Sequence, residues 1–330
     1  MMLDDELAII LNPKKAKTNR TAGAEKARKS NVLKRKGGHG SANLKKIARM
    51  AAKHPEVMVK VSGGAKGLRH TREHMNYITR NGDVEAETEQ GDILSNREQI
   101  NDKAQRWNQN DIGRGKGRQT VNLVLSMPPG TNEEKLKKAV RNFALRTFAA
   151  DREYLFVQHH DTKHPHCHLT LQAVGHDGKR LSPNKKQLQS WRESFAEALR
   201  EQGVKAEATP RQSRGVVKKG EKQAVLHAAK RKESIRQQQR IKEAGERLKG
   251  GNIKRPWESR ISEQQAAIRK SWANIAKEIE KRPEGVKMAS VIKDFIKGMP
   301  KPLTREQELV SKMASVIKQK EKEKEQGRGR

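Results

Sequence analysis

Apolar and polar residues follow two distinct patterns between residues 51 and 215. Short apolar runs that end at glycine, proline or polar residues predict strands at 56–64, 120–127, 153–160 and 166–175. Longer segments with apolar residues three or four positions apart predict helices at 70–83, 131–148 and 182–203. Thr131 and the acidic residues after it supply a helix start signal. We therefore expect an α+β fold, with a central antiparallel sheet backed by helices on one face.

Beyond residue 215 the strand pattern ends. The segments there are charged helix formers interrupted by Gly-Gly and by proline, which predicts a basic, mostly helical C-terminal region at 216–330. The heptapeptide KMASVIK occurs at 287–293 and again at 312–318. Two copies do not make a repeat architecture. They are consistent with a duplicated docking helix or with an ordinary amphipathic turn.

Charge divides the chain further and indicates its partner. Apolar residues make up 33% of the sequence and charged residues 34%, so a single core cannot extend through the whole chain. Net charge is +9 for residues 1–50 (13 basic minus 4 acidic), +8 for 51–215 (28 minus 20) and +16 for 216–330 (31 minus 15). We expect a basic flexible N-terminal arm at 1–50 and a folded domain at 51–215. The total of +33 favours DNA or RNA as the partner.

Several protein classes are disfavoured by what the sequence lacks. Cys167 is the single cysteine, so no internal disulfide is possible. No apolar run of 18 residues occurs, and the N-terminus has acidic residues where a signal peptide needs basic ones. We expect a cytoplasmic protein without membrane insertion.

Histidines are concentrated in one stretch, HHDTKHPHCH at 159–168, which holds five of the 11 in the chain. His166 and His168 are two residues apart, so on a strand they point to one face, about 6.6 Å apart. If 154–160 and 166–174 form a hairpin, His159 lies beside His166 across the ladder. These three residues are the predicted metal ligands. The absence of thiolate ligands disfavours a structural zinc site and favours a catalytic ion with open positions.

The other residues of this stretch have different predicted positions. Asp161 and His164 lie in the connecting turn, where they are placed to orient a ligand imidazole or to move a proton. Cys167 and His160 alternate away from the site, and Cys167 is expected in the core.

Phosphoryl transfer beside a metal ion also needs a nucleophile, and the chain has only two tyrosines. Tyr154 begins an apolar strand and is expected to be buried. On a helix, Tyr77 lies about 200° from Met75 and about 100° from Ile78, which places it off the apolar stripe. We therefore expect an exposed Tyr77. A phenol with a pKa near 10 suits a reversible strand cut, because it is a better leaving group than a sugar hydroxyl.

These residues resemble three motifs of conjugative relaxases, the mobilisation nucleases of plasmids and of T-DNA transfer, within the HUH endonuclease class. HHDTKHPHCH resembles the family's histidine signature, MNYITRNG its tyrosine motif and LVLSMPPGT its serine motif, in the family's order. The resemblance covers roughly residues 55–185. One departure is that about 76 residues precede the tyrosine, whereas relaxases often begin close to it.

The resemblance implies an enzyme that nicks one DNA strand at a plasmid transfer origin and stays bound to its 5′ end for transfer and religation. It implies Tyr77 as nucleophile, His159, His166 and His168 as ligands of Mg²⁺ or Mn²⁺, and Asp161 and His164 as auxiliary catalytic residues. DNA contacts are expected from Ser126 and from Arg80, which shares the face of Tyr77. The implied partners are origin DNA, accessory relaxosome proteins and a type IV secretion coupling protein. Passage into a recipient cell with the DNA is also implied.

Two other functions explain part of the pattern. A rolling-circle replication initiator shares the histidine cluster, but its tyrosine follows the cluster, whereas Tyr77 precedes it. A non-enzymatic, metal-stabilised DNA-binding protein accounts for the charge and the ion. It leaves a tyrosine on a polar helix face unexplained.

Overall fold

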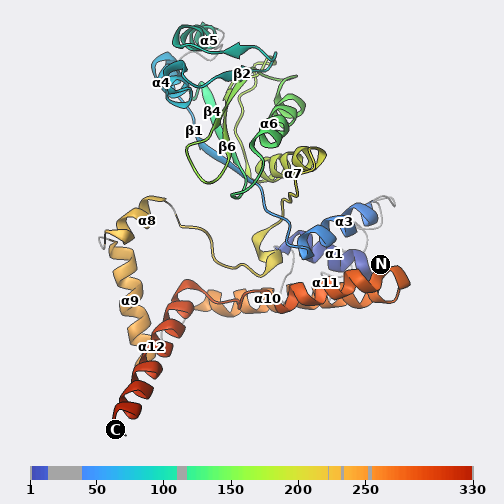
Figure 1. Ribbon diagram of the computed structural model, residues 1–330, viewed down its shortest axis with the longest axis vertical. Helices are drawn as coiled ribbons and strands as arrows, with labels where there is room; N and C mark the ends of the chain where they lie inside the picture. Colours follow the sequence, from blue (N-terminus) through green and yellow to red (C-terminus); the bar gives the residue numbers. More distant parts are fainter. Residues whose placement is uncertain are drawn as a thin grey trace. The chain divides into compact units, whose positions relative to one another are not determined.

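The computed structural model describes residues 2–13, 39–109, 117–221, 223–231, 234–251 and 255–328, which form two compact units (Figure 1). The first unit is Lys53–Ala208. The second combines Met1–Ala52 with Thr209–Arg330. The domain expected at 51–215 thus contains the whole of the first unit.

The first unit is built on a six-stranded sheet in which all neighbouring strands are antiparallel. Its strands, in spatial order, are β1 (Met58–Gly63), β4 (Thr120–Ser126), β6 (His166–Gln172), β5 (Tyr154–His159), β2 (Ala86–Thr88) and β3 (Ile93–Leu94). The four strands expected from the sequence are confirmed. The sequence pattern missed β2 and β3 because strands of three and two residues are too short to show an alternation.

Helices cover both faces of this sheet, so the expectation of helices on one face is wrong (Figure 1). On one face, α6 (Glu133–Phe148) and α7 (Lys185–Glu201) pack over a core that includes Phe143, Phe156 and Leu169. On the other, α4 (Gly67–Ile78) and α5 (Arg97–Gln109) pack against β5 and β2. Helix α5 was not expected from the sequence, because charged and amide side chains separate its buried apolar residues.

Side-chain caps fix the starts of α6 and α7. The side chain of Asn132 accepts a hydrogen bond from the backbone N–H of Lys135, so the N-cap of α6 lies one residue after the expected Thr131. Asn184 and Gln187 form a reciprocal capping box at the start of α7. Such caps satisfy backbone donors that the first helical turn leaves without partners.

The second unit consists of helices. They are α1 (Met2–Leu11), α3 (His39–Ala51), α8 (Gln223–Lys230), α9 (Ile235–Leu248), α10 (Pro256–Glu280), α11 (Val286–Lys297) and α12 (Arg305–Arg328). Among the described residues, none of the helices is both long and apolar enough to cross a membrane.

The core of the second unit joins the two ends of the sequence. Leu7 and Ile10 of α1 and Ile47 of α3 are buried with Trp272 of α10 and Ile292 of α11. Residues 2–11 and 39–51 are therefore packed helices and not the flexible arm expected at 1–50. Most of the remainder of that arm, residues 14–38, lies outside the described residues. These two helices were not expected because basic residues dominate the surrounding sequence, so the helical spacing of the apolar residues was not recognised.

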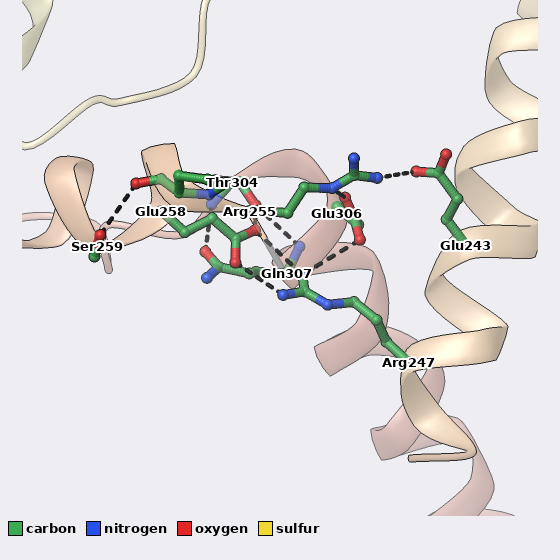
Figure 2. A network of polar contacts seen from close by, with 9 residues as sticks. Glu243, Arg247, Arg255, Glu258, Ser259, Thr304, Glu306 and Gln307 are labelled. Carbon is green, nitrogen blue, oxygen red and sulfur yellow. Dashed lines mark hydrogen bonds and ion pairs between the residues drawn. The ribbon is translucent and has the colours of Figure 1, made fainter. Parts of the chain in front are cut away.

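Ion pairs connect α9 and α12 to the start of α10 (Figure 2). Arg247 pairs with Glu258 at 2.9 Å and with Glu306 at 3.3 Å. Arg255 pairs with Glu306 at 3.2 Å and with Glu243 at 2.5 Å. Because these side chains are largely buried and each arginine has two acidic partners, they form a network and not a set of isolated surface pairs.

The two KMASVIK copies lie in different surroundings. In α11, Ala289 and Ile292 are fully buried in the core of the second unit, and Lys293 pairs with Glu280 at 2.6 Å. In α12, the equivalent Ala314 and Ile317 are exposed. The first copy is followed by Phe295, which is buried in the same core, whereas Gln319 and Lys320 follow the second.

Candidate active site

The three predicted metal ligands come together at one end of the β5–β6 hairpin. His159 lies directly opposite His166 across the ladder, and His168 is two residues further along β6. One ring nitrogen from each residue lies within 4.8 Å of the others. The hairpin geometry expected from the sequence is therefore confirmed. We call these three residues the histidine triad.

Backbone carbonyls fix two of the triad rings. The Nε2 of His159 lies 2.6 Å from the carbonyl oxygen of Ile78, and the Nδ1 of His166 lies 3.1 Å from that of His164. Because a carbonyl oxygen only accepts, each of these nitrogens carries the proton. The other ring nitrogen of each neutral imidazole then has a free lone pair, as a metal ligand requires.

The electrostatics of His159 and His168 favour neutral imidazoles. Burial lowers the pKa of His159 below its ordinary value, and burial together with the neighbouring histidines lowers the pKa of His168 to about 4. Cys167 is fully buried on the opposite sheet face, where burial raises the pKa of its thiol to about 12. The available donors are therefore three imidazoles without a thiolate, and they fit a divalent metal ion with further coordination positions open.

Tyr77 occupies the last turn of α4, with 64% of its side chain exposed. Its neighbours Met75 and Ile78 are buried under the same helix. Tyr154, by contrast, is 1% exposed. Both positions were expected from the sequence and are confirmed. The hydrogen bond from His159 to the Ile78 carbonyl connects the triad to the residue that follows Tyr77.

The turn after Tyr77 has an unusual backbone. Arg80 and Asn81 have positive φ values of 53° and 62°, and Gly82 follows at 102°. Residues other than glycine seldom adopt this left-handed backbone conformation. The Arg80 guanidinium lies 5.6 Å from the centre of the Tyr77 ring, and it also forms an ion pair with Asp161 at 2.5 Å. The conformation therefore places one cation beside two predicted catalytic residues.

The remaining predicted residues lie around the triad in different ways. Ser126 is 4% exposed and lies opposite His166 on β4. The side chain of His164 is exposed, and its carbonyl accepts the hydrogen bond from His166. His160 points away from the triad, as the alternation of side chains along the strand predicted. It pairs with Glu133.

His74 is a neighbour of the site to which the sequence assigned no role. It lies one helical turn before Tyr77, and its Nε2 is 3.1 Å from the hydroxyl oxygen of Thr170. Thr170 follows His168 by two residues on β6 and shares its sheet face. Burial lowers the pKa of His74 below its ordinary value. The sequence signal for His74 was its spacing of three residues from Tyr77, which places both side chains on the same side of the helix.

Part of the sheet face beside the triad is open. Across β4 and β1, the residues in line with the triad include Val124, Lys60 and Met58. Lys60 is exposed and Met58 is 46% exposed. The helices on this face pack against β5 and β2, at the other side of the sheet. A ligand that reaches the triad therefore has an accessible sheet surface next to it.

Comparisons with known proteins find a family match over part of the chain. Residues 77–204 match the family model for the nuclease domain of MobA/VirD2-like relaxases. A solved structure described as "Molecular Basis of Vancomycin Resistance Transfer in Staphylococcus aureus" is similar, with 10% identity and a TM-score of 0.33. That likeness covers 48% of this chain and 99% of the other. No curated protein matches the chain.

Proposed function

We propose that residues 77–204, which match the family model for the nuclease domain of MobA/VirD2-like relaxases, belong to a domain that nicks one DNA strand at a plasmid transfer origin with Tyr77 as the nucleophile. One observation carries the proposal. The only exposed tyrosine lies at the end of a helix whose Ile78 carbonyl is bound by a member of the histidine triad. This hydrogen bond links the helix that carries Tyr77 to the triad.

The reaction exchanges one phosphate ester for another. The Tyr77 oxygen attacks the scissile phosphorus, a tyrosyl–phosphorus bond forms, and the bond from phosphorus to the 3′ oxygen breaks. The phenolic proton leaves through a nearby base, and the released 3′ oxygen takes up a proton. The 5′ end stays on Tyr77, and attack by a later 3′-hydroxyl reverses the step without an external energy source.

Residues around Tyr77 have separate parts in this proposal. His159, His166 and His168 would hold the divalent metal ion, which when bound supplies Lewis-acid stabilisation of the charge on the phosphate. Arg80 and Ser126 position the DNA. Asp161 and His164 act as auxiliary groups at the edge of the triad. Imidazole ligands suit Mn²⁺ better than Mg²⁺, which prefers oxygen, so we favour Mn²⁺ among the two ions expected.

The DNA would lie along the open sheet face beside the triad. Lys60 is exposed there, Lys66 is exposed at the N-cap of α4, the helix of Tyr77, and Arg69 is exposed on that helix. Lysine and arginine bind phosphates of single-stranded DNA in a salt-dependent manner. We extend the proposal to the basic C-terminal helices, which would bind DNA phosphates or components of the transfer apparatus, including a coupling protein.

A covalent adduct tests the proposal. The full chain is mixed with a single-stranded oligonucleotide that carries the transfer origin and with Mn²⁺, and the products are separated on a denaturing gel. Wild type and Tyr154→Phe should form a protein–DNA adduct, and Tyr77→Phe should not. Tyr154→Phe is the matched control because these are the only two tyrosines in the chain. An adduct with Tyr77→Phe would refute the proposed nucleophile.

A further inference from the structure

Arg80 holds the carboxylate of Asp161 close to the triad. The guanidinium binds Oδ2 of Asp161, and Oδ1 of the same carboxylate lies 4.0 Å from Nε2 of His166. The Nδ1 of His166 donates to the carbonyl oxygen of His164, which leaves Nε2 as the ring nitrogen for a metal ion. At 4.0 Å the contact between Nε2 and the carboxylate is too long for a hydrogen bond. It places a carboxylate oxygen beside the nitrogen that would face a bound ion.

The ion pair between Arg80 and Asp161 is suited to the replacement of its carboxylate by another anion. Its two side chains are 41% and 48% exposed, so water and salt screen it, and such pairs contribute little to stability. A guanidinium also binds a phosphate through the same donors. An incoming DNA phosphate can therefore replace the carboxylate at small cost.

The backbone keeps Arg80 in place during such an exchange. Arg80 and Asn81 both have left-handed conformations, and Gly82 approaches the backbone of Asn96 and Arg97 so closely that a Cβ there would lie 2.6 Å from the nitrogen of Arg97. The turn is thus fixed against the start of α5. Only the side chain of Arg80 needs to move between Asp161 and a phosphate.

We propose that Arg80 and Asp161 form a latch, in which a DNA phosphate takes the guanidinium and releases Asp161 to become a fourth ligand of the ion held by the triad. The inference rests on the proposed function, because it takes DNA as the ligand that opens the latch. It assigns Asp161 a direct contact with the metal ion in place of the orienting role expected from the sequence. DNA binding and metal binding then strengthen each other.

Metal binding without DNA tests the first half of the latch. Mn²⁺ affinity of the metal-free full chain is measured by titration calorimetry for wild type, Arg80→Asn, Asp161→Asn and the double variant. Asparagine suits position 80 because it tolerates the left-handed backbone. Arg80→Asn should tighten Mn²⁺ binding about three- to fivefold, the range that an exposed ion pair accounts for. In the Asp161→Asn background the same change should leave Mn²⁺ affinity unaltered.

Two results would overturn the metal half of the latch. Equal tightening by Arg80→Asn in both backgrounds would show that removing a positive charge is sufficient. No tightening in the wild-type background would show that Arg80 does not restrain Asp161. Arg146→Asn is the matched control, since Arg146 of α6 forms an exposed ion pair with Glu201 of α7 at 2.7 Å, on the other face of the sheet. Its Mn²⁺ affinity should equal that of wild type, and tightening equal to that of Arg80→Asn would also count against the latch.

DNA binding without metal tests the second half. Binding of a twelve-nucleotide oligothymidylate is measured in chelator by fluorescence anisotropy. Asp161→Asn should tighten binding about three- to fivefold by freeing Arg80, and it should have no effect in the Arg80→Asn background. An equal effect in both backgrounds would refute the exchange. Neither assay requires cleavage, so failure of the latch leaves the Tyr77 adduct in place, and loss of the adduct refutes the proposed function independently.

Discussion

The imidazole of His159 donates a hydrogen bond from Nε2 to the carbonyl oxygen of Ile78, over a distance of 2.6 Å. Ile78 follows Tyr77 and is the last residue of α4, while His159 is the last residue of β5. The contact therefore couples the helix of the exposed tyrosine to the strand that ends at His159, across 81 positions of sequence. In the proposed enzyme, a shift in the position of the His159 ring would therefore affect the nucleophile as well as the bound ion.

Loss of two triad residues should separate catalysis from binding. His166→Ala combined with His168→Ala should reduce oligonucleotide cleavage by at least about a hundredfold, because removing ligands costs metal affinity and activity together. Oligonucleotide binding should change much less, since phosphate contacts come from elsewhere. Gel-based cleavage and anisotropy measure the two effects. His160→Ala, an exposed histidine paired with Glu133, is the control. Cleavage by the double variant in chelator at the wild-type rate would contradict the metal assignment.

Acid should destabilise the metal-free protein through its buried histidines. Burial lowers the folded-state pKa of His74, His159 and His168, the last to about 4, from an unfolded value near 6.5. Between pH 6.5 and pH 4 the unfolded chain binds protons that the folded chain does not, so stability falls as the pH decreases through this window. Thermal unfolding in chelator should show this decrease. His168→Gln should weaken the dependence, and an unchanged pH dependence in that variant would show that His168 titrates normally when folded.

Two glycines with positive φ allow a matched test of the turn after Tyr77. A Cβ at Gly82 would meet the backbone of Asn96 and Arg97, whereas a Cβ at Gly91 would meet nothing within 4 Å. Gly91→Ala should therefore cost about 1 kcal/mol from its backbone conformation alone. Gly82→Ala should cost more and should also lower the nicking rate, because the turn that carries Arg80 must shift. Chemical denaturation and cleavage assays measure these effects, and equal costs at the two positions would argue against a fixed turn.

The repeated KMASVIK heptapeptide offers a test of DNA binding by the C-terminal helices. Lys312 and Lys318 of α12 occupy the positions of Lys287 and Lys293 of α11. If α12 contacts phosphates, Lys312→Gln with Lys318→Gln should reduce the salt slope of single-strand binding by about 1.4, and nicking of a short oligonucleotide should persist. Lys287→Gln with Lys293→Gln is the matched double variant and should leave the slope unchanged. Equal reductions in both would indicate diffuse attraction without a contact by α12.

Local patterns were sufficient to predict much of the site. The period of two along β6 placed His166 and His168 on one face and Cys167 on the other, and the short turn brought His159 into register. Helical spacing identified Tyr77 as exposed. In each case a short stretch of sequence contains the whole geometric argument, so no knowledge of distant contacts was needed.

Distant contacts explain what the sequence did not reveal. The pairing of Arg80 with Asp161 joins residues 81 positions apart, and its geometry depends on a left-handed backbone that the sequence suggests only through Asn81 and Gly82. Helix α1 packs on α10, more than 240 residues later, so its apolar positions had no visible partner in the sequence. Long-range packing therefore changed the interpretation of the N-terminal region, while it left the local description of the hairpin intact.

Cys167 has a practical consequence for work in solution. Its thiol is the only one in the chain, it is fully buried, and burial raises its pKa to about 12, so it should be inert toward alkylating reagents while the sheet is intact. A cysteine introduced at an exposed position such as Ser311 should then accept a fluorophore selectively, without replacement of the native residue. Reaction of the native thiol would in turn report opening of the sheet beneath the triad.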